Sequence, residues 1–161
     1  MVLSFTIHPI DASHNQAVKQ LIQRGGREFG AIGDGFGPSD SEVEAMSLNY
    51  CEPQRGYWVA LQQNQVVGCG GIAELDDASK TCELRKLFVN PQCRGQGIGK
   101  ALAKHCLQEA KQRGYQQCYL DTLSTMESAI ALYQSLGFNH LSEPFVNSIH
   151  SGCDVWMMKT L

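Results

Sequence analysis

Apolar and polar positions alternate in some segments of the chain and repeat at helical spacing in others. Alternation predicts strands over residues 2–8, 57–61, 65–75, 81–89, 116–123 and 153–161. Helical spacing predicts helices after Asp11, after Ser41, from Ile98 to Ala110 and after Ser124. Strands and helices alternate in the middle of the chain, whereas hairpins dominate its first half. We therefore predict an α/β fold with a mixed sheet.

Glycines and capping-box spacings set the expected helix ends. Gly25–Gly26 is expected to stop the first helix. Ser41 with Glu44, and Ser124 with Glu127, have the three-residue spacing of a capping box. These pairs predict the starts of the second and fourth helices.

Composition limits the class of protein. The chain has 161 residues, of which 43% are apolar and 18% charged, which fits one globular domain over residues 1–161. The net charge of -3 argues against a surface that coats nucleic acid. No basic leader precedes an apolar run, and no segment approaches the roughly 20 apolar residues of a membrane span. We expect a cytoplasmic protein without a membrane or nucleic-acid partner. The sequence does not decide between a monomer and a homodimer.

The cysteines do not form a recognisable framework. The chain has seven, an odd number, scattered without a C-x-x-C pair, and its five histidines are also dispersed. A disulfide scaffold or a zinc site would need paired or clustered ligands. We therefore expect reduced thiols and no metal.

The segment "CRGQGIGKAL", residues 93–102, is the strongest candidate for ligand binding. Alternate glycines between a strand and a helix favour an anion, because bare backbone N–H groups and the helix dipole both attract it. The dinucleotide fingerprint fails because Lys100 or Leu102 stands where glycine is required. The P-loop fails at Arg94 and Ala101. A different phosphate compound is therefore expected.

Residues 94–99, R-x-x-G-x-G, resemble the coenzyme A loop of the GCN5-related N-acetyltransferases, the GNAT family. The downstream stretch "AIALYQSLGF", residues 129–138, is similar to the second signature of that family. The resemblance runs from about residue 57 to the C-terminus. It implies an α/β GNAT fold, with a mixed, mostly antiparallel sheet flanked by helices. Two splayed parallel central strands, 82–89 and 116–122, would form the cofactor cleft.

The resemblance also implies acetyl-CoA as co-substrate. Backbone groups of three residues on the central strand would bind its pantetheine arm, and backbone N–H groups of the glycine loop would bind its pyrophosphate. The expected cofactor-binding residues are Leu87, Phe88, Val89, Arg94, Gly95, Gln96, Gly97, Ile98, Gly99, Lys100 and Tyr133.

Two side chains are candidates for acetyl transfer to a primary amine. In the family, a glutamate at the position of Glu83 acts as general base in several members, and a tyrosine at the position of Tyr133 is the usual acid for the leaving thiolate. An amine with a pKa near ~10 must lose a proton before it attacks, so a carboxylate suits the first role. Simpler alternatives are a Glu83–Arg85 ion pair and a core aromatic on the last helix. Strand alternation predicts that Glu83, Arg85 and Leu87 share one face, with Leu84, Lys86 and Phe88 on the other.

Two positions raise chemical questions. Many relatives carry asparagine where this chain has Met126, so either Ser124 or Thr125 replaces its polar contact or the contact is absent. Cys93, beside the loop, offers an alternative in which an acyl-cysteine forms first, although no histidine pairs with it in sequence.

The acceptor is the least defined part of the hypothesis. Arg85 and His150 are candidate substrate-binding residues, which would favour an anionic small molecule such as an amino acid. Four acidic residues between 34 and 44 leave open the alternative that the acceptor is an amine of a protein or peptide. A non-catalytic module that binds and senses acyl-CoA is the remaining alternative. Retention of Glu83 and Tyr133 favours an enzyme that transfers acetyl directly to a small-molecule amine in a ternary complex.

Overall fold

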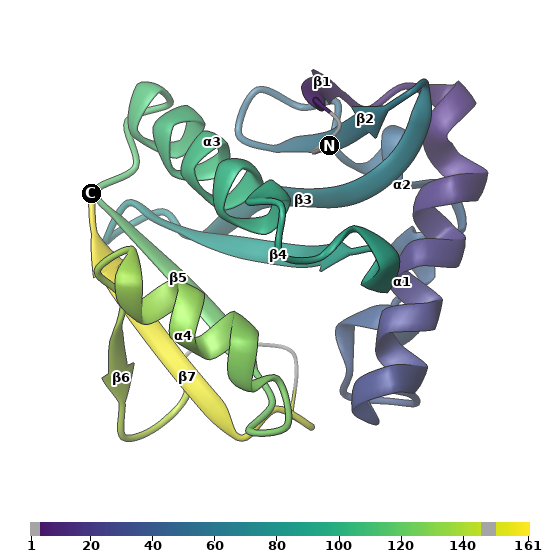
Figure 1. Ribbon diagram of the computed structural model, residues 1–161. Helices are drawn as coiled ribbons and strands as arrows, with labels where there is room; N and C mark the ends of the chain where they lie inside the picture. The colour runs from purple at the N-terminus through teal and green to yellow at the C-terminus, as the bar shows by residue number, and fades with distance from the viewer. Residues whose placement is uncertain (1–3, 146–150) are drawn as a thin grey trace.

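The structure is a computed structural model that describes residues 4–145 and 151–161. Its centre is a mixed sheet of seven strands in the order β1-β2-β3-β4-β5-β7-β6 (Figure 1). The strands are β1 (Thr6–Pro9), β2 (Gly56–Gln62), β3 (Gln65–Asp76), β4 (Thr81–Val89), β5 (Gln117–Thr122), β6 (Asn139–Leu141) and β7 (Val155–Thr160). The helices are α1 (Asn15–Phe29), α2 (Met46–Asn49), α3 (Ile98–Gln112) and α4 (Glu127–Ser135). Short 3-10 turns are η1 (Ala12–His14), η2 (Gly37–Ser39), η3 (Ser41–Ala45) and η4 (Pro91–Cys93).

Hydrophobic side chains cover both faces of the sheet. On one face, α3 and α4 pack through residues such as Leu102 and Tyr133. On the other, α1 and the η3–α2 segment pack through residues such as Ile22 and Met46. Figure 1 shows α3 lying over β3 and β4, and α4 lying over β5 and β7. Because both faces are buried, β2 is buried along nearly its whole length and does not alternate.

The central strands β4 and β5 are parallel and separate after a short pairing. Their register runs only from Thr81–Gln117 to Glu83–Tyr119. Beyond it the two strands diverge, so that the two halves of the sheet open like a V (Figure 1). The sequence predicted this mixed sheet with a splayed parallel pair, and the prediction is confirmed.

A bulge in β4 overturns the predicted side-chain alternation. Gly71 pairs with Arg85 and Cys69 pairs with Phe88, so that Lys86 and Leu87 together face one β3 residue. Lys86 takes a positive φ of 49° at this point. The extra residue resets which side of the sheet each later side chain faces.

The faces of β4 therefore differ from the expectation. Leu87 packs with the α3-side cluster that contains Leu84, whereas Phe88 packs with the α1-side cluster. Arg85 and Lys86 both reach Glu42 on η3. The predicted grouping of Leu87 with Arg85, and of Lys86 with Leu84, was wrong because simple alternation does not survive a bulge.

Helix α1 continues through Gly25–Gly26, where the sequence predicted its end. A side chain at Gly25 would lie 2.2 Å from Phe88, and one at Gly26 would lie 2.7 Å from Pro38. These glycines let the helix approach β4 and η2 closely. The helix ends instead at Gly30, whose φ of 75° is left-handed.

Local turn chemistry was predicted with mixed success. The β2–β3 hairpin is confirmed, and Gln63 and Asn64 in its turn both have positive φ. Neither capping box forms, because η3 and α4 begin without a side-chain cap. Ser124 bonds instead to Asp154, at 2.9 Å through its N–H and 2.8 Å through its hydroxyl. Strand β6 was not predicted.

The described helices also bear on membrane insertion. Across residues 4–145 and 151–161, none is long and apolar enough to cross a membrane.

Candidate active site

A cavity of about 470 Å³ lies between β4, the glycine loop and the start of α4. Ten of the eleven residues predicted to bind the cofactor line it, and Gln96 is the exception. The ten are Leu87, Phe88, Val89, Arg94, Gly95, Gly97, Ile98, Gly99, Lys100 and Tyr133. The tertiary structure therefore brings the two sequence signatures to one cavity.

The glycine loop exposes backbone N–H groups at the start of α3. Gly95 and Gly97 have left-handed φ values of 80° and 82°, and no described atom beyond their chain neighbours lies within 4 Å of where their side chains would begin. Gly97 is the N-cap of α3 and offers no side-chain cap, so the first N–H groups of the helix face outward from Ile98 on. With the exposed Lys100 beside them, these groups form a site suited to an anion.

Two side chains of the loop are held by distant residues. The Arg94 guanidinium forms two 2.7 Å hydrogen bonds with Glu28 and lies 5.4 Å from the Phe29 ring. This contact holds the pKa of Glu28 below its usual value. Gln96 accepts a 2.9 Å hydrogen bond from Gln62 in β2. The Gln96 side chain is therefore turned toward β2, which explains why it does not line the cavity.

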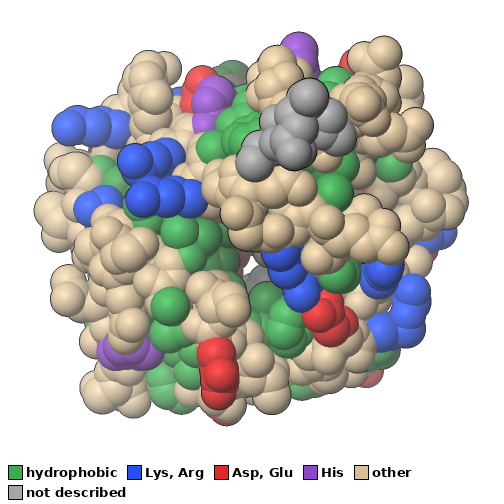
Figure 2. All heavy atoms as spheres, in the orientation of Figure 1, with side chains coloured by type: hydrophobic (Ala, Val, Ile, Leu, Met, Phe, Trp, Pro, Cys, Tyr) green, Lys and Arg blue, Asp and Glu red, His purple; other side chains and the backbone are tan. Residues whose placement is uncertain are grey.

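A second, narrower cavity of about 70 Å³ lies where β4 and β5 separate. Its walls come from the two strands, from residues 36–38, and from Cys153 before β7. Figure 2 shows a hollow in the middle of this face, bordered by hydrophobic side chains with charged side chains nearby. The two cavities share Leu87, Phe88, Met126 and Tyr133. A ligand in one would therefore meet a ligand in the other at this boundary.

The glycine-rich loop 30–38 and the turn 151–153 cover the narrow cavity together. The Gly152 N–H donates to the Gly35 carbonyl at 3.0 Å. Gly152 also packs so tightly that a side chain there would lie 2.5 Å from the Phe36 ring. These contacts hold residues 35–36 and Gly152 together beside the narrow cavity.

Glu83 and Arg85 form an ion pair on the wall of the narrow cavity. Glu83 is only 1% exposed, and Arg85 Nε donates to its carboxylate at 2.6 Å. Arg85 also lies 3.8 Å from Glu42. Burial acts to lower the pKa of Arg85, but its interactions with Glu83 and Tyr50 outweigh burial and the net shift is upward. The cation expected to meet a substrate is thus already engaged by carboxylates.

Lys86 anchors the η2–η3 segment to the bulge. Its ammonium group lies 2.8 Å from Asp40 and 3.1 Å from Glu42, and its side chain is 2% exposed. The Lys86 carbonyl accepts a 2.7 Å hydrogen bond from Tyr57. These contacts fix the wall of the narrow cavity that faces η3.

Tyr133 lies at the boundary of the two cavities. Its ring packs 5.8 Å from Phe138 and is only 6% exposed. Burial raises the pKa of its hydroxyl, which therefore stays protonated at neutral pH. The hydroxyl has no hydrogen-bond partner among the residues that the structure describes. It can therefore donate to a ligand.

Cys93 lines the larger cavity but lacks the environment of a nucleophile. Its sulfur lies 3.9 Å from the side-chain oxygen of Gln62. Within the described part of the chain, no histidine or carboxylate contacts it. The arrangement gives no support to an acyl-cysteine route.

Met126, the position at which the family resemblance implies asparagine, also lines both cavities. Its sulfur accepts a 3.3 Å hydrogen bond from Thr122. The Thr125 hydroxyl donates to the Phe29 carbonyl at 3.0 Å, and the Ser124 hydroxyl is used at the start of α4. Both hydroxyls considered as substitutes are therefore bonded within the protein.

Sequence reasoning missed part of the narrow cavity. Asp121 and Cys153 line it, and Glu42 stands behind Arg85. The position of Asp121 carried a signal, because it lies at the carboxyl end of a parallel strand, where ligands collect in open sheets. His150, the other predicted substrate residue, lies outside the described residues.

Comparison with known proteins gives the family. Residues 18–138 match the acetyltransferase (GNAT) family. The uncharacterized N-acetyltransferase YjgM of Escherichia coli K12 is 36% identical over 149 residues, which are 91% of this chain and 89% of YjgM. A GNAT-family acetyltransferase from Staphylococcus aureus Mu50 superposes with a TM-score of 0.83 at 21% identity, over 98% of this chain and 99% of that one. YncA of Salmonella typhimurium, solved with acetyl-CoA, superposes at 0.78 with 18% identity, over 98% and 94%. The chain therefore belongs to the GNAT family and is an N-acetyltransferase that uses acetyl-CoA.

Proposed function

We propose that the chain transfers acetyl from acetyl-CoA directly to a primary amine of a small molecule while both substrates are bound. The observation that carries this proposal is the meeting of two cavities at Tyr133. One is large and ends in an anion-binding glycine loop, and the other is narrow and charged. Substrates held one in each cavity would have their reacting atoms side by side, as direct transfer requires.

We assign the larger cavity to acetyl-CoA, which supplies the activated acetyl group. Beyond Glu83, the described part of β5 no longer pairs with β4. Backbone groups of residues 87–89 can therefore bond the pantetheine arm as a neighbouring strand would. The N–H groups from Arg94 through Lys100 suit the pyrophosphate, because the left-handed glycines leave them accessible. YncA, which holds acetyl-CoA, has the same fold and supports this assignment.

We assign Glu83 as the general base. In this role its carboxylate takes a proton from the acceptor ammonium, directly or through a water, and the neutral nitrogen then attacks the thioester carbon. Its position on the wall of the narrow cavity supports the role. The 2.6 Å contact with Arg85 supports a second reading, in which Glu83 serves only to neutralise that cation. The two readings differ in what Glu83→Gln does to turnover.

We assign Tyr133 as the general acid. As the carbon–sulfur bond breaks, the electron pair goes to sulfur, and the tyrosine hydroxyl supplies the proton that makes the free thiol. The raised pKa of Tyr133 keeps that proton in place until it is needed. Its position between the cavities supports contact with the sulfur of a cofactor bound in the larger one.

The cover over the narrow cavity favours a small molecule over a protein acceptor. A peptide chain would need an open groove on both sides of the reacting amine. The bond between Gly152 and Gly35, and the packing of Gly152 on Phe36, close one side. A small amine needs less room beside these segments than a peptide chain does.

The first experiment measures thiol release from acetyl-CoA with a panel of small primary amines. We expect turnover with at least one amine and formation of the acetylated product. Binding of acetyl-CoA without turnover on any amine or peptide would instead support a module that only senses the cofactor.

The second experiment tests the two catalytic assignments. Glu83→Gln should lower kcat/KM by about 100-fold or more, and Tyr133→Phe should lower kcat by roughly 100-fold, while acetyl-CoA still binds. The matched controls are Glu52→Gln, at an exposed residue, and Tyr115→Phe, at a half-buried one; both residues lie outside both cavities. The Tyr133→Phe defect should shrink with an acyl donor whose thiol is more acidic, because that leaving group needs less help. Near-native turnover of either variant would remove the corresponding role.

A further inference from the structure

Four side chains lie where the two cavities meet, and we call them the boundary residues. Leu87, Phe88, Met126 and Tyr133 line both cavities. Two of them, Leu87 and Tyr133, pack with the hydrophobic cluster on the α3 side of the sheet. The other two, Phe88 and Met126, pack with the cluster on the α1 side. The boundary residues therefore approach the gap between β4 and β5 from both faces of the sheet.

The two boundary residues of β4 are backed by glycines. A side chain at Gly25 in α1 would come within 2.2 Å of the Phe88 ring. A side chain at Gly70 in β3 would come within 2.6 Å of Leu87. Because protein interiors are close-packed, moving Phe88 or Leu87 away from the boundary would require α1 or β3 to shift.

Met126 is held through its sulfur, its packing and its backbone. The Thr122 hydroxyl donates to the sulfur at 3.3 Å, and the side chain packs with the α1-side cluster. The Met126 N–H donates to the Leu123 carbonyl at 2.9 Å. The neighbouring Thr125 hydroxyl donates to the Phe29 carbonyl at 3.0 Å, which ties this turn to the end of α1. These contacts keep the Met126 side chain at the boundary, although methionine is an adaptable residue.

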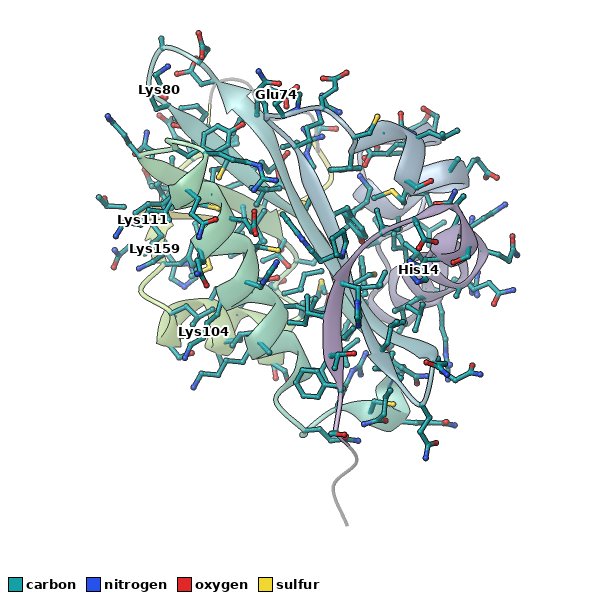
Figure 3. All side chains as sticks on the ribbon, turned by 90° about the horizontal axis from the view of Figure 1, so that it is seen from above. His14, Glu74, Lys80, Lys104, Lys111 and Lys159 are labelled. Carbon is teal, nitrogen blue, oxygen red and sulfur yellow. The ribbon has the colours of Figure 1, made fainter. Side chains whose placement is uncertain are left out.

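The boundary residues offer apolar contact and no ion pair. Three have hydrocarbon or thioether side chains and the fourth is a tyrosine, so none is charged at neutral pH. Lysines such as Lys104, Lys111 and Lys159 extend from the outer flank of the molecule (Figure 3), and none of the three lines either cavity. Met126 stands where the resemblance implies asparagine, and a thioether packs against carbon but donates no hydrogen bond. The boundary thus suits a short hydrocarbon group.

We propose that Met126, backed by Phe88, limits the length of the acyl chain that the enzyme transfers. In the proposed function the donor carbonyl carbon lies at this boundary, because it must meet the amine that enters from the narrow cavity. The methyl end of an acetyl group then meets Met126 and Phe88. A longer chain must displace these side chains or draw the thioester away from the amine. This inference rests on the proposed function and adds to it the selectivity for the donor, with Met126 as the specificity residue.

The expected discrimination follows from the properties of methionine. One additional methylene group should be tolerated, because the unbranched thioether can adjust. A second should not be, because Phe88 behind it is held against Gly25. A methylene group that a pocket does not accommodate changes kcat/KM by about 10- to 200-fold. We therefore expect kcat/KM for propionyl-CoA to lie within about tenfold of that for acetyl-CoA, and butyryl-CoA to fall about 100-fold or more below acetyl-CoA.

The test measures thiol release from acetyl-, propionyl-, butyryl- and hexanoyl-CoA with the best amine of the panel. Met126→Ala should bring butyryl-CoA to within about tenfold of acetyl-CoA, because it removes the side chain that meets the longer chain. Met126→Leu, which nearly conserves volume, should keep the discrimination of wild type. The remote control is Leu48→Ala, at a side chain that is 72% exposed and lines neither cavity, and it should also keep the discrimination. Thermal midpoints of the variants verify that each is folded.

Titration calorimetry of the same donors without an acceptor gives a readout that does not depend on turnover. Butyryl-CoA should bind wild type more weakly than acetyl-CoA does, and Met126→Ala should remove that difference. Wild-type kcat/KM for butyryl-CoA within about threefold of that for acetyl-CoA would overturn the inference and leave the proposed function intact, as would an unchanged ratio in a folded Met126→Ala. Failure of the proposed function has a different signature, which is the absence of thiol release from acetyl-CoA with every amine.

Discussion

Replacing Lys86 with methionine should destabilise the protein more than most single substitutions. The ammonium group of Lys86 lies 2.8 Å from Asp40 and 3.1 Å from Glu42, and the side chain is 2% exposed. The methionine side chain fills nearly the same space as that of lysine, so the main loss is the positive charge. Two carboxylates would then face each other without their shared cation.

The size of the effect follows from burial. Removing one partner of a fully buried ion pair costs about 3 to 5 kcal/mol. Here the side chains of Asp40 and Glu42 retain 28% and 16% exposure, so water can solvate them in part. We therefore expect a loss of about 2 to 3 kcal/mol in the free energy of unfolding. For a chain of this length, that corresponds to a thermal midpoint lower by roughly 5 to 10 °C.

Urea unfolding of wild type, Lys86→Met, Glu42→Gln and the double variant measures the coupling between the two charges. We expect the double variant to be more stable than the sum of the single losses predicts, because Glu42→Gln relieves the repulsion that Lys86→Met exposes. Single losses below about 0.5 kcal/mol, with additive effects in the double variant, would refute the reasoning. As a control, Lys86→Met should bind acetyl-CoA as wild type does, because Lys86 does not line the larger cavity.

Three further substitutions test other parts of the site. Gly97→Val should abolish the rise in thermal midpoint that acetyl-CoA gives, because valine strains a φ of 82°, and a full rise would contradict the assigned loop. Glu28→Gln should tighten coenzyme A binding severalfold at low salt, as measured by titration calorimetry, because it removes a carboxylate that competes for Arg94; unchanged affinity would dismiss that competition. Burial raises the pKa of Tyr133, so the stability from its neutral form is complete below about pH 10 and is lost as pH rises toward the folded pKa. Thermal midpoints of Tyr133→Phe should therefore fall less than those of wild type above about pH 10, and parallel falls would exclude the contribution.

Local features of this protein were readable from the sequence alone. The β2–β3 hairpin followed from apolar runs around a polar turn, and β4 followed from one apolar segment that ends at Asn90-Pro91. The glycine loop and Tyr133 followed from short motifs whose residue types are required by backbone geometry or by chemistry. Such features depend on neighbours a few residues away, so a sequence pattern is enough to predict them.

Contacts between distant segments decided what the sequence left open. Gly25 looked like a helix end, yet it lies inside α1. A glycine stands there because Phe88 leaves no space for a side chain. Alternation failed at Lys86 because a bulge is fixed by pairing with β3 and by contacts to η3. Such features depend on which segment packs against which, and no local pattern records that.

The narrow cavity shows the same division most sharply. The sequence alone presented Arg85 as a cation for a substrate, because its contact with Glu42 could not be known. The fold places Glu42 beside it, 43 positions earlier in the chain, and brings Asp121 to the neighbouring strand end. The sequence by itself determined the family and predicted the cofactor loop. The charge of the narrow cavity was decided only by the tertiary structure, because electrostatic fields sum over residues that are close in space and not in sequence.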